Sequence, residues 1–138
     1  MSHRAKFLQV LSVSDYRIES GAEAQRDPSG QVLTYNAVRI WLLGTPALPH
    51  HTVSGAFLEA RSTWPEPAVP RYDFHRKRIL VSYTMASIQP VVSMLLDGVQ
   101  LYCQYRELEG GSIYADVHKA QQVPEGAAAE ERHWVPAG

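Results

Sequence analysis

The side chains best suited to chemistry lie in residues 99–119, VQLYCQYRELEGGSIYADVHK. The alternation of residue types around Gly110 and Gly111 predicts two short strands joined by a turn. One face of this hairpin is apolar. The other face carries Tyr102, Gln104, Arg106, Tyr114, Asp116 and His118. Aromatic rings stack on planar groups and arginine binds phosphate, so this polar face is the leading candidate for a binding surface.

The apolar pattern also predicts the register of the hairpin. A three-residue loop over residues 109–111 pairs Tyr105 with Ala115 and Cys103 with Val117, which gathers the apolar side chains on one face. A two-residue turn would mix apolar with polar residues. On the polar face the same register predicts three pairs: Arg106 with Tyr114, Gln104 with Asp116, and Tyr102 with His118. Each such pair contributes roughly 0.2–1 kcal/mol, so the row could also serve stability alone.

A second strand, predicted over residues 32–43, adds to this face. It presents Arg39 and Trp41 on the side opposite its Val-Ile-Leu positions. Bases of single-stranded nucleic acid stack on tyrosine and tryptophan, while basic side chains hold the phosphates. We therefore predict a non-enzymatic domain that binds single-stranded nucleic acid. The predicted binding residues are Arg39, Trp41, Tyr102, Arg106, Tyr114, His118, Arg76 and Lys77.

Two other interpretations stay open for the same residues. Trp41 could be a core residue and the tyrosines could simply pave a sheet. Alternatively, the chain could be a protein-interaction or self-associating subunit, using the same face, the Pro-rich loop 62–76 with its PxxP at Pro67 and Pro70, or a tail anchored by Trp134. Residues 1–120 hold 12 Lys and Arg against 11 Asp and Glu. This near-neutral balance provides no long-range field toward nucleic acid or a membrane.

Catalysis has little support in the sequence. Cys103 falls on the predicted apolar face, where a thiol stays protonated. His50 and His51 could join Asp116 and His118 around a metal ion, but no recognised ligand spacing is present. We therefore predict no enzyme activity, no catalytic residues, no cofactor and no metal.

Length and composition indicate what kind of domain carries the candidate binding residues. The 138 residues, 45% of them hydrophobic, suit one β-rich domain over residues 1–120, followed by an acidic, Ala-rich tail over residues 121–138. No apolar run is long enough to span a bilayer, so no membrane partner is predicted. The single cysteine favours a reducing compartment, and we predict a cytoplasmic location.

The remaining elements follow from local patterns. Strands are predicted over residues 6–18, 32–43, 52–61 and 78–85, with a loop over residues 20–31. Residues 87–97 predict an amphipathic helix capped by Ser87, with Pro90 in its first turn and Gly98 just after its end. The predicted fold is mostly β within the α+β class. It is a small curled sheet or OB-like partly open barrel of about six strands, with the helix before a C-terminal hairpin. A six-stranded sheet with the helix on one face is the alternative.

Overall fold

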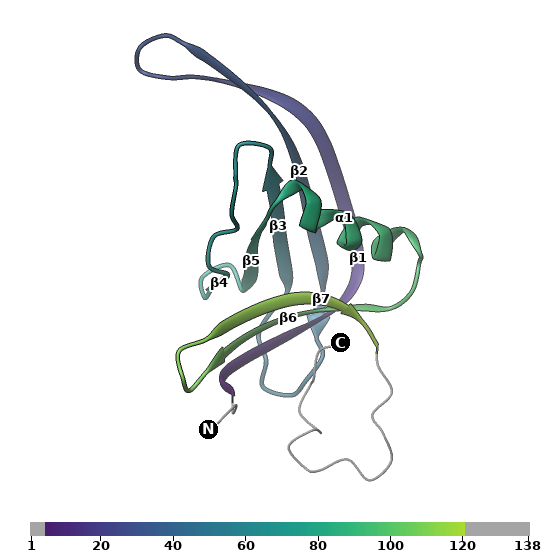
Figure 1. The fold of residues 1–138 in the computed structure, drawn as a ribbon. Helices are drawn as coiled ribbons and strands as arrows, with labels where there is room; N and C mark the ends of the chain where they lie inside the picture. The colour runs from purple at the N-terminus through teal and green to yellow at the C-terminus, as the bar shows by residue number, and fades with distance from the viewer. Residues whose placement is uncertain (1–4, 121–138) are drawn as a thin grey trace.

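Seven strands form one sheet in the order β4-β5-β3-β2-β1-β6-β7 in the computed structural model, which describes residues 5–120 (Figure 1). The elements are β1 (Ala5–Arg26), β2 (Val32–Pro46), β3 (Gly55–Arg61), β4 (Arg71–Asp73), β5 (Arg78–Tyr83), α1 (Met85–Leu96), β6 (Leu101–Leu108) and β7 (Ile113–Lys119). Neighbouring strands are antiparallel except β3 and β5, which are parallel. The predicted mostly-β fold with one helix before a C-terminal hairpin is confirmed. The predicted tail lies outside the described residues.

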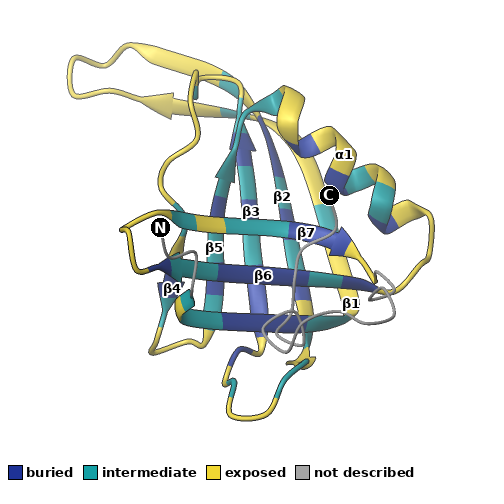
Figure 2. Ribbon diagram, turned by 60° about the horizontal axis from the view of Figure 1, so that its bottom comes forward, coloured by how far each residue is buried: buried dark blue, intermediate teal, exposed yellow. Residues whose placement is uncertain are grey.

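Strand β1 belongs to both halves of the curled sheet. Its first residues pair with β6 as far as Ser12, and its residues from Leu11 onward pair with β2. The register with β2 shifts between Val13 and Asp15, which marks a β-bulge. A bulge bends a strand and increases its twist. Figure 2 shows the result: β1, β6 and β7 cross over β5, β3 and β2, so that the sheet becomes a half-barrel.

The bend brings two backbones unusually close together. Gly44 on β2 lies opposite Val13 on β1. A Cβ atom at Gly44 would lie 1.8 Å from the carbonyl oxygen of Ser12. No side chain fits at that distance from a backbone atom, so glycine is required at this position.

The core lies between the two crossed layers. Its largest fully buried aliphatic side chains come from β1, β2, β3, β5 and α1: Leu11, Ile40, Leu42, Leu58, Ile79 and Ile88. Helix α1 packs against β2, β3 and β5 and also reaches β7, and it buries Ile88, Val91 and Leu95. The apolar stripe predicted on the helix therefore closes the opening of the half-barrel. Burial of each large aliphatic side chain contributes roughly 1.5–3 kcal/mol.

The helix begins earlier than its sequence suggested. Thr84 is the N-cap, and its Oγ1 accepts the N–H of Ser87 at 3.1 Å. Ser87 instead occupies the third helical position, where its hydroxyl accepts the N–H of Thr84 at 2.9 Å and completes a capping box. Pro90 consequently lies in the second turn, on the exposed side. Gly98 has the predicted positive φ of 72° after the helix end.

Residues 20–26 continue β1 into a β-arm rather than forming the predicted loop, and only residues 27–31 are a turn. Strand β1 continues to Arg26 and pairs with β2 from Val32, around a turn in which Asp27 Oδ1 accepts the N–H groups of Ser29 and Gln31. Figure 1 shows this arm projecting beyond the body of the sheet. The predicted Pro-rich connection also contains β4, which makes a seventh strand. The sequence did not predict the arm because its strands consist mostly of small and polar residues without an alternation of apolar positions.

The close approach at Gly44 generates a stability prediction. Replacing Gly44 with alanine should lower the free energy of unfolding by about 1–3 kcal/mol, because the new methyl group forces the two backbones apart. Gly21, also in a strand, has open space around its Cβ position and no positive φ. Gly21→Ala is the matched control and should leave stability unchanged or raise it slightly. Urea denaturation followed by circular dichroism measures both. If Gly44→Ala were as stable as the native chain, the bend would tolerate a side chain at this position.

Candidate nucleic-acid interface

The hairpin of β6 and β7 has the register predicted from its sequence. Arg106 pairs with Tyr114, Gln104 with Asp116, and Tyr102 with His118. The Arg106 guanidinium lies 5.5 Å from the centre of the Tyr114 ring. The Tyr102 and His118 rings stack with centroids 6.0 Å apart, and His118 Nδ1 lies 2.7 Å from an Asp116 carboxylate oxygen. The structure therefore brings together four of the predicted binding residues as one row of aromatic, charged and polar pairs.

Only part of this row is accessible. Tyr114 is 48% exposed and Arg106 is partly exposed, whereas Gln104 and His118 are buried, at 0% and 4%. Tyr102 is intermediate. The exposed pair lies toward the hairpin turn, where β6 ends and β7 begins. A ligand on this face would therefore meet Tyr114 and Arg106.

The structure places Arg39 and Trp41 on a different surface. They alternate with Ile40 and Leu42, which face the core, so they lie on the outside of the β2 layer. Tyr102 and Arg106 lie on the outside of the crossed β6 layer. Because the two layers face each other across the core (Figure 2), their outer surfaces point away from each other. These residues share one sheet but not one ligand surface.

Carboxylates already engage Arg39. Its guanidinium pairs with Glu23 and also with Glu59, where Nε lies 2.7 Å from a carboxylate oxygen. Hydrogen bonds from Arg39 and Tyr35 lower the pKa of Glu23 to about 2. The same pairing with Glu23 and Glu59 raises the pKa of Arg39. The guanidinium is therefore neutralised within the sheet, and it is poorly suited to hold a phosphate.

Trp41 is also covered in part. Its ring lies 5.1 Å from that of Phe57, and the Arg17 guanidinium lies 4.4 Å from its centre. Its exposure is intermediate. These contacts resemble packing on an outer sheet face more than an open stacking platform.

An aromatic cluster that sequence analysis missed lies at the end of the half-barrel where β1 begins. Its four members are Phe7, Tyr72, Phe74 and Tyr105, with neighbouring ring centroids 5.0–6.1 Å apart. Burial raises the pKa of Tyr72, and burial together with a hydrogen bond to Glu107 raises the pKa of Tyr105 to about 12. Phe74 is 69% exposed. We call these four residues the mouth cluster.

Two of the basic residues predicted to bind nucleic acid lie close in sequence to the mouth cluster. Arg76 and Lys77 are exposed in the turn between β4 and β5, two and three residues after Phe74. Asp73 Oδ1 accepts the N–H groups of His75 and Arg76, both at 3.0 Å, and these bonds shape the turn. The Arg76 bond is the main reason that the pKa of Asp73 is lowered. Among the described residues, neither Arg76 nor Lys77 forms an ion pair.

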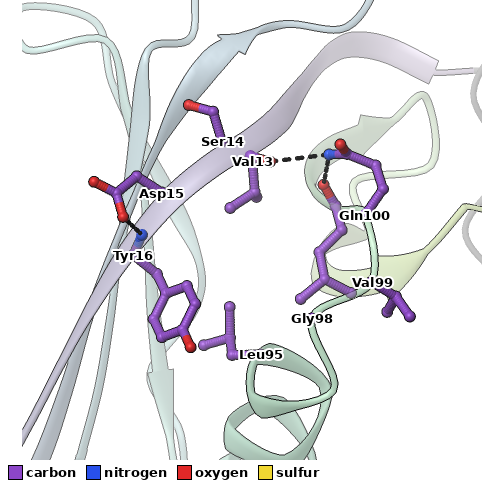
Figure 3. A pocket seen from close by; sticks show the side chains of 9 residues that line it. Val13, Ser14, Asp15, Tyr16, Leu95, Gly98, Val99 and Gln100 are labelled. Atoms are coloured by element: carbon purple, nitrogen blue, oxygen red, sulfur yellow. Dashed lines mark hydrogen bonds between the residues drawn. The ribbon is translucent and has the colours of Figure 1, made fainter.

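A separate pocket of about 450 Å³ lies beside the bend of β1 (Figure 3). Residues 13–16 form one wall, and Leu95 with residues 98–101 forms the other. The side chain of Gln100 spans the rim, where its Nε2 donates to the carbonyl oxygens of Val13 and Leu101, both at 2.9 Å. None of the predicted binding residues lies in this pocket.

The groups considered for catalysis or metal binding do not converge. Burial raises the pKa of the Cys103 thiol, which is fully enclosed. His51 Nδ1 accepts the N–H of Val10 at 3.0 Å. Within residues 5–120 there is no group of three or more His, Cys, Asp or Glu side chains arranged to hold a metal ion. The same residues include no helix with the length and apolar character needed to cross a bilayer.

Comparison with known proteins found no similarity. The chain matches no protein-family model, no curated protein and no solved structure.

The pairing of Glu23 generates a prediction about pH. The pKa of Glu23 falls from its ordinary 4.5 to about 2 in the folded protein. Its contribution to stability is therefore complete above about pH 5 and is lost as the pH falls toward 2. Glu23→Gln should be less stable than the native chain at pH 6, and the difference should shrink at pH 2.5. Urea midpoints at the two pH values test this.

Glu109→Gln is the matched control, because Glu109 is exposed in the hairpin turn. This variant should keep the native pH profile. A stability difference for Glu23→Gln that is the same at both pH values would contradict the assigned role of the ion pair.

Proposed function

We propose that this protein is a non-enzymatic module that binds single-stranded nucleic acid at the mouth cluster. The observation that carries the proposal is the exposed ring of Phe74, which rests on Phe7 and Tyr72 beside two cations that form no ion pair within residues 5–120. Arg76 and Lys77 supply those cations. The proposal also includes a cytoplasmic location, on the evidence of the single cysteine.

The chemistry of the mouth cluster suits a base and its phosphate. A ring stacked on aromatic side chains contributes about 1–3 kcal/mol per base, and any base can stack. Residues 71–78 contain Arg71, Arg76, Lys77 and Arg78 against the single carboxylate of Asp73. This local excess of positive charge supports phosphate binding even though the chain as a whole is close to neutral.

The hairpin offers a second contact on the other side of β6. Tyr105 faces the core end of the mouth cluster, whereas Arg106 alternates to the outer face, where it meets Tyr114. The proposal therefore retains Arg76 and Lys77 from the sequence prediction and adds Phe74, and Arg106 with Tyr114 would be reached by a nucleic-acid strand that continues around β6 to its outer face. Arg39 and Trp41 are left out because their partners lie within the sheet.

Fluorescence anisotropy with a labelled oligothymidylate or oligouridylate at low salt tests the proposal. Phe74→Ala should weaken binding by about 1–3 kcal/mol, which corresponds to roughly 5- to 150-fold in the dissociation constant. Arg76→Gln combined with Lys77→Asn should weaken binding further. The double variant should also reduce the slope of log K against log salt by about 0.7 for each phosphate that the protein no longer neutralises.

Two variants serve as controls. Val69→Ala removes an exposed apolar side chain from the Pro-rich connection, and Lys119→Gln removes an exposed cation at the end of β7 that lies away from the hairpin turn. Both should bind as the native chain does. The proposal is wrong if the native chain shows no binding at low salt, or if Phe74→Ala binds equally well.

A further inference from the structure

The second half of β1 has a free edge. Strand β6 pairs with β1 only as far as Ser12, and the Gln100 side chain then covers the carbonyl of Val13. From Arg17 to Arg26, the described residues pair with β1 only on its β2 side. Figure 1 shows this stretch running along the side of the sheet and out into the arm. A row of unpaired N–H and C=O groups of this length is a template for another strand.

This edge lacks several of the features that normally prevent pairing. Residues 17–26, RIESGAEAQR, contain no proline, no lysine and no bulge, and the charges of Arg17, Glu19, Glu23 and Arg26 sum to zero. On β2, which pairs with this part of β1, the side chains of Val32 and Leu33 are 51% and 55% exposed. A two-stranded ribbon is at best marginally stable in water by itself. An additional strand would therefore stabilise the arm.

The other edge of the arm is a weaker candidate. Strand β2 is open only over residues 32–35, because Asn36 exchanges hydrogen bonds with Ser62: its N–H donates to the Ser62 hydroxyl at 2.9 Å, and its carbonyl accepts the Ser62 N–H at 2.8 Å. The β1 edge is more than twice as long. It is therefore the surface on which a partner strand gains most.

We propose that two copies of this chain pair antiparallel through their β1 edges, about a twofold axis that passes at Ser20. In this register Arg17 of each copy lies opposite Glu23 of the other, and Ile18 lies opposite Ala22. Opposite charges on directly paired residues stabilise a sheet. The edge is thus complementary to itself, which favours a second copy as the occupant.

Neighbouring registers are less favourable. Side chains keep their faces only if the pairing shifts by whole steps of two residues. One step in either direction sets Glu19 opposite itself or opposite Glu23, and like charges in direct pairs destabilise a sheet. Larger shifts either shorten the ladder or run into the bulge between Val13 and Asp15. The register centred on Ser20 has the longest ladder without either fault.

The existing contacts of Arg17 and Glu23 are compatible with this pairing. Arg17 pairs with Glu19 at 2.8 Å, where both side chains are exposed and the pair contributes little in water, and its guanidinium lies 4.4 Å from the centre of the Trp41 ring. Glu23 already pairs with Arg39, so Arg17 of the second copy would be an additional partner for its carboxylate. The register also brings Ala24 of the second copy opposite Tyr16, a partly exposed ring that lines the pocket beside the bend (Figure 3). This gives Tyr16 an apolar neighbour across the new strand pair.

Disulfide trapping tests the register. Ser20→Cys should give a disulfide-linked dimer under mild oxidation, because the two residues would lie directly opposite each other. Ala22→Cys, on the same face, should not be trapped, because its two copies would be about 13 Å apart along the strands. The native Cys103 is fully buried and does not compete. Equal or preferential trapping of Ala22→Cys would overturn the register.

Light scattering and sedimentation equilibrium test the pairing itself. The native chain should be a dimer, and Ser20→Lys should raise the dissociation constant at least tenfold, because it sets two like charges opposite each other. Gln89→Lys, which adds the same charge to the exposed side of α1, should leave the dimer intact. A monomeric native chain, or a Ser20→Lys dimer as stable as the native one, would overturn the proposal. Circular dichroism verifies that each variant is folded.

Discussion

The fold depends on the close contact between Gly44 and the backbone of β1. A strand that served only one layer would leave the apolar face of β6 without a partner. The bulge near Ser14 turns β1, and the missing side chain at Gly44 lets β2 follow the turn. The two layers then face each other, and α1 fills the remaining opening with Ile88, Val91 and Leu95. Core formation is therefore a consequence of this backbone geometry together with apolar alternation.

The bend also determines which side chains share a surface. It separates the outer face of β2 from that of β6, so Arg39 and Trp41 cannot join the hairpin residues around one ligand. At the same time it brings the start of β1 to β4, which packs Phe7 against Tyr72 and Phe74. The mouth cluster therefore forms where segments distant in the sequence meet, and neither β1 nor β4 predicts it alone.

The predictable features are those specified within a few residues. The hairpin register followed from Gly111, which has a φ of 91°, and from the alternation on either side. The apolar stripe of α1 was equally clear. The arm was not predictable, because its ladder joins small polar residues and carries no apolar period. The neutralisation of Arg39 was also hidden, since Glu23 and Glu59 come from neighbouring strands that only the tertiary register aligns with it.

Strand β1 links the two proposed surfaces and keeps them apart. Phe7 of the mouth cluster lies near the start of this strand, and Ser20 of the proposed dimer edge lies 13 residues later, beyond the bend. In an antiparallel pair the two strands run in opposite directions, so the two mouth clusters lie on opposite sides of the twofold axis. Neither cluster needs the edge atoms that the pairing uses. Dimer formation through β1 would therefore leave both proposed nucleic-acid surfaces accessible, and one oligonucleotide long enough to reach both could bind with higher avidity than a short one.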